Sequence, residues 1–226
     1  MKYRPDEIEK SSMEIIDEEL IKRGCKNVTD SDEMTVIKRV IHTTADFDYY
    51  ENLCFINDPV KRGTETIKGG NATVVTDTNM ALAGINKRAL EKNGCEAVCF
   101  MNDERIIKIS AERNITRAAA SMEHAAALYP SGIYSIGNAP TALLSIGELI
   151  GENRISPALV IAVPVGFVNV LESKEYIKEI CEKKGIPLIL SEGRKGGSTV
   201  AVSVVNSILY MAGDMTDPAG RCFSGS

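Results

Sequence analysis

A short run around one of the two histidines carries the side chains best suited to acid–base chemistry. Between residues 39 and 48, an apolar stretch with helical spacing ends at His42 and gives way to two threonines and two aspartates. Histidine titrates at about pH 6.5 without special help, so it can donate or accept a proton near neutrality. Taken alone, the run favours an ordinary histidine at a helix end that donates to a carboxylate. A proton-transfer role for His42 therefore needs support from the rest of the chain.

Two loops rich in small residues could bind an anion. They are Gly137-Asn138-Ala139-Pro140-Thr141 and Arg194-Lys195-Gly196-Gly197-Ser198, and a helix is predicted to begin directly after each. Free N–H groups and partial positive charge at a helix N-terminus attract anions, and arginine adds a two-pronged grip on a carboxylate. Arg117 stands at a third predicted helix start, where an anionic partner would compensate its unfavourable charge. Ordinary capped turns and a solvated Arg117 are the alternatives.

Composition and missing motifs argue against several classes of protein. The formal net charge of −5, the 5% of aromatic residues and the absence of tryptophan argue against nucleic-acid binding. The first residues contain no apolar signal-peptide core, and prolines and a glycine interrupt the longest apolar stretch, 155–171, so we expect no membrane contact. The six cysteines form no C-x-x-C pair, so we expect reduced thiols, a cytoplasmic location and no metal site built by the protein. Neither loop matches a nucleotide-binding fingerprint.

The elements that would position these side chains repeat one strand-then-helix unit. Residues 1–60 are charged and predicted to be mainly helical, with a short helix over 46–53. Five apolar strands follow, each leading into a helix, at 73–76, 97–100, 133–136, 158–163 and 187–190. This pattern predicts an α/β fold, with a doubly wound, five-stranded and mostly parallel sheet covered by helices on both faces.

The predicted sheet forms one domain over residues 1–213. Residues 1–60 are expected to be its helical N-terminal extension, and residues 214–226 a loose tail. Right-handed crossovers bring all five strand-to-helix loops to one edge of the sheet, where open α/β sheets bind ligands. We therefore expect one cleft from residues far apart in the sequence: Thr78, Asn79, Asn138, Thr141, Gly166, Arg194, Lys195 and Ser198.

Seven segments between about residues 5 and 205 carry a family resemblance. They are Pro5-x-x-Ile8-Glu9-x-x-Ser12, residues 40–48 around His42, Asp77-x-x-Met80-x-x-Ala83-Gly84-Ile85, residues 116–120, Gly137-Asn138-Ala139-Pro140-Thr141-Ala142-Leu143, Pro164-Val165-Gly166-Phe167-Val168-Asn169 and residues 193–198. In this order they resemble the precorrin-8X methylmutase family, which includes the cobalt-precorrin-8 enzymes of anaerobic cobalamin synthesis.

The resemblance implies a function and a site. It implies an isomerase of corrin biosynthesis that moves a methyl group from C11 to C12 of (cobalt-)precorrin-8 by a 1,5-sigmatropic shift, giving hydrogenobyrinate or its cobalt form. It implies a flavodoxin-like fold, a homodimer, a polycarboxylate corrinoid substrate and no cofactor, since any cobalt would arrive within the substrate. The family's catalytic histidine corresponds to His42, as proton or hydrogen-bond donor to a ring nitrogen. The substrate-binding candidates are Ser12, Arg39, Thr43, Thr78, Asn79, Arg117, Asn138, Thr141, Arg194 and Lys195.

Three further hypotheses accompany this interpretation. Asp46 or Asp48 would orient or charge His42. A non-catalytic corrinoid carrier is the alternative function, because tight binding of a polyanionic product would leave a similar sequence. A flavodoxin-like nucleotide or response-regulator module is disfavoured, because the phosphate-binding fingerprints are missing.

Overall fold

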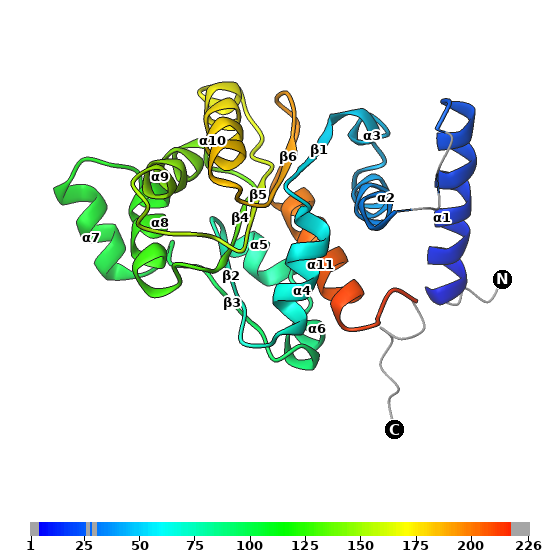
Figure 1. Ribbon diagram of the computed structural model, residues 1–226, viewed down its shortest axis with the longest axis horizontal. Coiled ribbons are helices and arrows are strands. Elements are labelled where there is room, and N and C mark those ends of the chain that lie inside the picture. Colours follow the sequence, from blue (N-terminus) through cyan, green and yellow to red (C-terminus); the bar gives the residue numbers. More distant parts are fainter. Residues whose placement is uncertain (1–4, 26–27, 29–30, 218–226) are drawn as a thin grey trace.

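The computed structural model describes residues 5–25, 28 and 31–217 of the chain. A single six-stranded sheet forms its centre (Figure 1), with the order β1-β6-β5-β4-β2-β3. The strands are β1 (Leu53–Ile56), β2 (Thr73–Thr76), β3 (Glu96–Val98), β4 (Ile133–Ile136), β5 (Leu159–Ala162) and β6 (Leu188–Ser191). The predicted loose tail therefore falls mostly outside the described residues, which end at Asp217.

Five of the strands run parallel, in the order β3-β2-β4-β5-β6. Numbered along the chain, this is the flavodoxin order 2-1-3-4-5, whose switch point lies between β2 and β4. The predicted α/β sheet, mostly parallel with helices on both faces, is confirmed.

The predicted number of strands is wrong, because a sixth strand lies at one edge. Strand β1 pairs antiparallel with β6, with Leu53 opposite Ser191. The helix predicted over 46–53 covers only α3 (Tyr49–Asn52), and the strand begins at the next residue. Since no loop marks the change, and three of the four strand residues are only half-buried, the sequence lacks the usual strand signals here.

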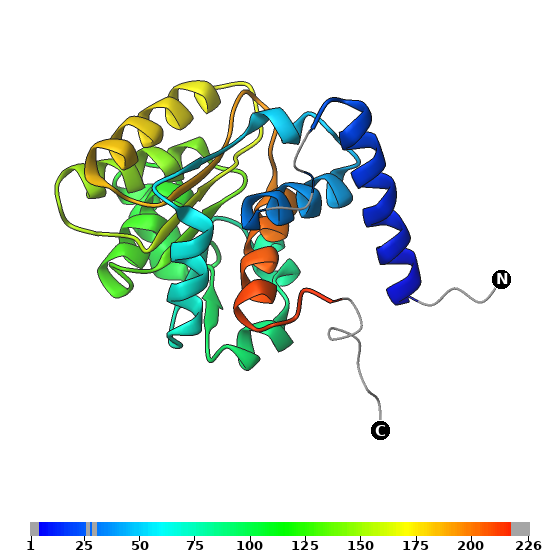
Figure 2. The ribbon, with the colours of Figure 1, turned by 45° about the vertical axis from the view of Figure 1, so that its right-hand side comes forward.

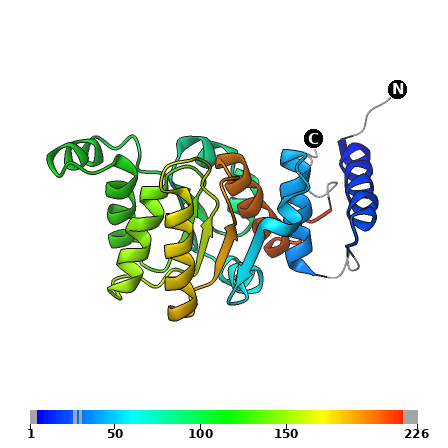
Figure 3. The same ribbon diagram turned by 90° about the horizontal axis from the view of Figure 1, so that it is seen from above.

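The helices lie on both faces of the sheet. They are α1 (Pro5–Lys22), α2 (Asp32–Thr44), α4 (Pro59–Lys68), α5 (Asn79–Gly84), α6 (Lys87–Lys92), α7 (Glu104–Glu112), α8 (Arg117–Leu128), α9 (Pro140–Gly151), α10 (Val170–Lys184) and α11 (Ser198–Ala212). Figure 3 shows α8, α9 and α10 on one side of the sheet; on the other, α2 and then α1 stack outside α11. Within the described residues, no helix is both long enough and apolar enough to cross a membrane.

Alternation along the strands explains the two layers. In β5, Leu159 and Ile161 belong to the core beneath α4 and α11, whereas Val160 and Ala162 belong to the core beneath α9 and α10. Successive side chains of a strand point to opposite faces. A strand that is apolar throughout therefore contributes to both cores, as expected for a parallel sheet.

Two predicted connections contain structure of their own. The single helix predicted after the strand at 73–76 is broken into α5 and α6, and a further helix, α7, lies between β3 and α8. At the break, the Asn206 side chain accepts from the Asn86 N–H at 2.9 Å and donates to the Gly84 carbonyl at 3.1 Å. Backbone groups freed by the break are thus satisfied from α11, which a local pattern does not reveal.

Helix α2 begins and ends at residues that position His42. Ser31 caps its start by accepting from the Met34 N–H at 3.1 Å, and serine is among the residues preferred at this position. Val40 and Ile41 are buried, and Ala45 ends the helix in the left-handed region, with φ 54°. His42 therefore lies in the last turn, on the exposed side of a helix whose other side is anchored in the core. Figure 2 shows α2 lying against α11.

We predict that Ile161→Ala destabilises the fold strongly. Ile161 is fully buried in β5, so the change leaves a cavity and should lower the free energy of unfolding by about 2–5 kcal/mol. Ile107→Ala is the matched control, because this isoleucine in α7 is 42% exposed and its loss should cost only about 0.5 kcal/mol. Urea unfolding followed by circular dichroism measures both. Equal effects would contradict the described core.

Candidate functional site

A cleft of about 360 Å³ opens beside His42. Three helices build it, and its lining residues are Arg39, His42 and Thr43 of α2, Met80 and Gly84 of α5, and Ser198, Thr199, Val202, Ser203, Asn206 and Tyr210 of α11. His42 is exposed to this space. The predicted acid–base residue therefore lies in a hollow lined with hydroxyl and amide groups rather than on an open surface.

The polar side of α11 was not predicted from the sequence. Thr199, Ser203, Asn206 and Tyr210 recur at intervals of three or four residues in a helix that is otherwise mostly apolar. Such spacing puts them on one face. This stripe is the signal that could have identified them, and only Ser198, at the start of the helix, was expected in the cleft.

Hydroxyl pairs join the elements around the cleft. The Thr43 hydroxyl donates to the Arg39 carbonyl at 2.9 Å and shares a hydrogen bond with the Ser203 hydroxyl at 3.1 Å. Thr78 and Ser198 share a hydrogen bond at 2.9 Å, and Thr78 also caps α5. These contacts link α2 and α5 to α11 and bring Thr43, Thr78 and Ser198 to one edge of the sheet.

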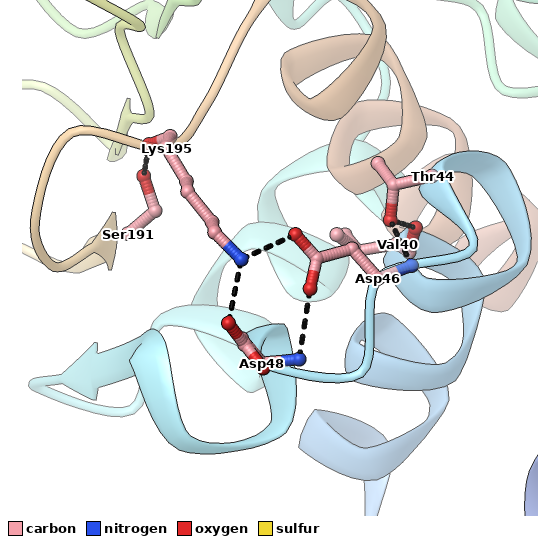
Figure 4. Close-up of polar contacts among 6 residues, drawn as sticks. All are labelled: Val40, Thr44, Asp46, Asp48, Ser191 and Lys195. Atoms are coloured by element: carbon pink, nitrogen blue, oxygen red, sulfur yellow. Dashed lines mark hydrogen bonds and ion pairs between the residues drawn. The ribbon is translucent and has the colours of Figure 1, made fainter.

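Lys195 holds two aspartates instead of pointing alone into the cleft (Figure 4). Its Nζ lies 2.6 Å from Asp46 Oδ2 and 2.6 Å from Asp48 Oδ2. The hydrogen bond from Lys195 lowers the pKa of Asp46, and the two carboxylates raise the pKa of Lys195. A charge shared in this way is a weaker attractant for a substrate carboxylate than the sequence implied. The role of either aspartate in orienting His42 stays a prediction.

Asp77 clamps the neighbouring loop from inside the protein. Its fully buried carboxylate accepts from the backbone N–H groups of Gly137 at 3.0 Å, Asn138 at 2.7 Å and Ala139 at 2.7 Å. Burial raises the pKa of Asp77, while the three N–H donors act in the opposite direction. Sequence reasoning named Asp77 only as part of a motif, because an aspartate after a strand does not reveal its partners 60 residues away.

The loops after β4 and β6 meet in close contact. A side-chain carbon at Gly137 would lie only 2.8 Å from the Gly197 carbonyl and from Ser198 Cα. The Gly197 N–H donates to the Val163 carbonyl at 2.9 Å, and the Gly166 N–H donates to the Arg194 carbonyl at 3.3 Å. The predicted convergence of these loops at one sheet edge is therefore observed, with glycines where the backbones touch.

The remaining predicted residues spread outward from the cleft. Asn79 is exposed at the start of α5, and Asn138 is exposed in the bend that precedes α9. Thr141 shares a hydrogen bond at 2.8 Å with Thr116, the residue that caps α8. Arg117 follows at the exposed start of α8. Among the described residues, neither Arg117 nor Thr141 lines the cleft that contains His42.

Arg39 connects the cleft to the N-terminal helix. Its Nη1 lies 2.6 Å from Glu9 Oε1, and its guanidinium stands 5.7 Å from the centre of the Tyr210 ring. Arg39 also lines a second hollow of about 500 Å³ between α1 and α2. Ser12, by contrast, donates to the Ile8 carbonyl within α1 at 2.9 Å, and it is absent from the described lining of both hollows.

The chemistry available in the cleft is acid–base and anion binding. Helix α11 begins at Ser198, and Gly197 before it offers no side-chain cap, so the first N–H groups of the helix are available beside Ser198 and Thr199. Within residues 5–25, 28 and 31–217, no three His, Cys, Asp or Glu side chains are grouped as a metal site would require. The exposed guanidinium of Arg194 lies on the loop that borders this edge.

We predict that Asp77→Asn destabilises the protein. The amide keeps the shape of the carboxylate but turns an NH₂ donor toward backbone N–H groups, so the free energy of unfolding should fall by about 1–3 kcal/mol. Asp103→Asn is the control, because Asp103 caps α7 and asparagine caps a helix nearly as well. Thermal and urea unfolding measure both variants. A loss no greater for Asp77→Asn than for Asp103→Asn would contradict the clamp.

Comparison with known proteins identifies the family of the chain. The family model described as precorrin-8X methylmutase matches residues 7–211. A cobalt-precorrin-8 methylmutase of Leptospira interrogans is 42% identical over 91% of this chain and 93% of its own length. The corresponding protein of Priestia megaterium is 40% identical over 92% and 89%. A crystal structure titled as precorrin-8x methyl mutase from Thermus thermophilus superposes with a TM-score of 0.80 at 36% identity, covering 92% of this chain and 98% of that one. The chain belongs to the precorrin-8X methylmutase family.

Proposed function

We propose that the protein is an isomerase of cobalamin biosynthesis that moves a methyl group from C11 to C12 of cobalt-precorrin-8 or precorrin-8. The observation that carries this proposal is that the family match over residues 7–211 includes every residue lining the cleft beside His42. The relatives' names supply the substrate class, and the cleft supplies groups suited to it.

His42 acts as the acid in this mechanism. It donates a proton or a hydrogen bond to a ring nitrogen beside the migrating methyl group, which lowers electron density at the carbon that receives it. Acid assistance of this kind is worth about 10²–10⁴-fold in rate. The hydroxyls of Thr43, Ser198 and Ser203 hold the ring by one face, and positioning supplies a further part of the acceleration.

The carboxylate arms of the substrate meet positive potential at the rim. Arg39 and the uncapped start of α11 lie within the cleft, and Arg194 and Arg117 stand exposed along the same edge of the sheet. We propose that these groups bind carboxylates and that the reaction uses no cofactor, since a methyl shift within one molecule needs neither a redox partner nor a methyl donor. Any cobalt belongs to the substrate.

We further propose that the enzyme is a cytoplasmic homodimer. The cleft of about 360 Å³ is at the small end of the roughly 300–1,000 Å³ range of ligand pockets, whereas a tetrapyrrole with its arms exceeds a drug-sized ligand. Phe167 is 85% and Val168 77% exposed on a loop at the same edge, and exposed apolar side chains that lie together are typical of a protein–protein interface. The five cysteines of the described part are free thiols, which suits a reducing compartment.

The dimer has a direct test. Sedimentation equilibrium should give twice the chain mass of 24.5 kDa. Phe167→Glu, which places a charge in the exposed apolar loop, should shift the protein toward the chain mass, whereas Ile107→Glu on α7 should not. A wild-type protein that sediments at the single-chain mass would remove the dimer from the proposal.

The activity is tested by following the visible absorption of precorrin-8, and separately of its cobalt form, over time with less enzyme than substrate. Departure of the methyl group makes C11 sp², so conjugation lengthens and absorption should move to longer wavelength. A change that exceeds one equivalent of enzyme supports a mutase, and the relative rates identify the preferred substrate. A change that stops at one equivalent, or binding without change, would favour the corrinoid carrier.

We predict that His42→Ala lowers kcat by about 10²–10⁴-fold while the substrate still binds. His124→Gln is the control, because this second histidine lies in α8 with its ring 4.8 Å from the Phe100 ring and outside the described lining of the cleft. Its turnover should match the wild type. Normal turnover in His42→Ala together with normal binding would remove the acid role.

A further inference from the structure

Lys174 is a buried cation that the proposed chemistry does not use. It lies in the second turn of α10, only 3% exposed, with its side chain beneath the loop that follows β6. Removing an ammonium group from water is costly unless hydrogen bonds or an opposite charge replace the lost solvation. The contacts described for Lys174 contain no carboxylate, so hydrogen bonds alone must hold it.

Its three N–H donors match three acceptors. Nζ donates to the Ser191 hydroxyl at 3.1 Å, to the Gly193 carbonyl at 2.8 Å and to the Lys195 carbonyl at 3.0 Å. The Ser191 hydroxyl donates in turn to the Lys195 carbonyl at 2.9 Å. An ammonium has three donors and no acceptor, so every hydrogen of Lys174 has its partner within residues 191–195.

The loop so gathered connects three parts of the site edge. At its start, the Glu192 N–H donates to the Asn52 carbonyl at 2.7 Å. In its middle, the Lys195 side chain holds Asp46 and Asp48, the aspartates that follow the His42 helix (Figure 4). At its end, Gly196 packs so closely against the Val163 carbonyl that no side chain fits. The backbone that Lys174 fixes thus carries both Arg194 and the start of α11.

We propose that Lys174 is a positioning residue, whose buried ammonium fixes the loop 193–197 and, through Lys195, the segment after His42. This inference rests on the proposed function for its effect on catalysis, whereas its effect on the loop is independent of it. The ammonium does not touch the cleft. It fixes the backbone that carries Arg194 and the first turn of α11, the groups proposed to bind substrate carboxylates.

The charge of Lys174 can be removed without mutation. Burial lowers its pKa from 10.5 to about 8. The titratable groups around it are Glu175 and Lys178 on α10, Glu192, Arg194 and Lys195 in the loop, Cys54 on β1, and Asp46 and Asp48 beyond Lys195. The hydrogen bond from Lys178 lowers the pKa of Glu192. The carboxylates of Asp46 and Asp48 raise the pKa of Lys195, and burial raises the pKa of Cys54 to about 11. Each of these three shifts moves the pKa of its group further from pH 8.

Activity and stability should therefore change in opposite directions above pH 8. Neutral Lys174 has two hydrogens for three acceptors and turns a lone pair toward one of them, so the loop loosens and kcat/KM should fall. Between pH 8 and 10.5 the unfolded chain still binds this proton while the folded chain does not, so the contribution of Lys174 to the free energy of unfolding rises. Unfolding caused by this titration cannot then explain the lost activity.

The test compares Lys174→Met with Lys178→Met, one turn further along α10. Lys178 pairs with Glu192 on the surface, so it controls for the loss of a lysine beside the same loop. Lys174→Met should lower kcat/KM by about 10–100-fold at pH 7 and abolish the decline near pH 8, since misplacement of a site by about 1 Å can cost 10²-fold. Lys178→Met should keep wild-type kcat/KM and the decline.

Hydrogen exchange provides a readout that needs no turnover. Peptides covering residues 192–198 should exchange faster in Lys174→Met than in Lys178→Met, and in the wild type they should lose protection between pH 7 and 9 after correction for the intrinsic rate. Unchanged protection in both comparisons, or a wild-type pH profile that survives in Lys174→Met, would overturn the inference. Should Lys174→Met fail to fold, the wild-type exchange and pH profile decide. A wild-type protein without turnover would instead count against the proposed function, with the exchange result still deciding the role of Lys174.

Discussion

The buried carboxylate of Asp77 is the constraint on which the cleft depends. Open α/β sheets usually bind ligands in the crevice where the strand order reverses, here between β2 and β4. Asp77 occupies that crevice and takes the three backbone N–H groups that an anionic ligand would otherwise use. The cleft that contains His42 opens instead in the next gap, between α2, α5 and α11.

Helix α11 serves the core and the cleft at once. Val204, Ile208 and Leu209 are buried against the sheet, while the stripe of polar residues faces α2 and α5. Part of that stripe is structural, because Asn206 satisfies the break between α5 and α6 and Tyr210 accepts from Asn86 at 3.1 Å. Nearer the start of the helix, the hydroxyls of Ser198 and Ser203 bond to Thr78 and Thr43 and also line the cleft beside His42.

Local patterns predicted the parallel strands and the helical stretch that ends at His42, because apolar runs reflect structure over only a few neighbouring positions. They missed β1, since an edge strand continuous with a helix has no boundary signal. They also treated Lys195 as an available cation, whereas Asp46 and Asp48, about 150 residues earlier, share its charge. The contacts of Asp77 and Lys174 were missed for the same reason. The groups that bond to each of them lie far away in the sequence and come close only in the folded chain. The resemblance of the sequence motifs identified the family without any knowledge of these contacts.

The attachment of α1 differs between its two ends. Leu20, near the end of the helix, is fully buried, whereas nearer the start the helix is joined to α2 by the ion pair of Glu9 with Arg39, at 2.6 Å, in which the two side chains are 21% and 16% exposed. Salt screens exposed ion pairs, with a Debye length of about 8 Å at physiological ionic strength, but it screens a partly buried pair much less and leaves apolar burial intact. Rising ionic strength therefore acts on the Glu9 end of α1 more than on the end that Leu20 packs. The Glu9 end of α1 is also the end that borders the hollow of about 500 Å³ lined by Arg39, so the width of that hollow depends on a polar contact rather than on apolar packing.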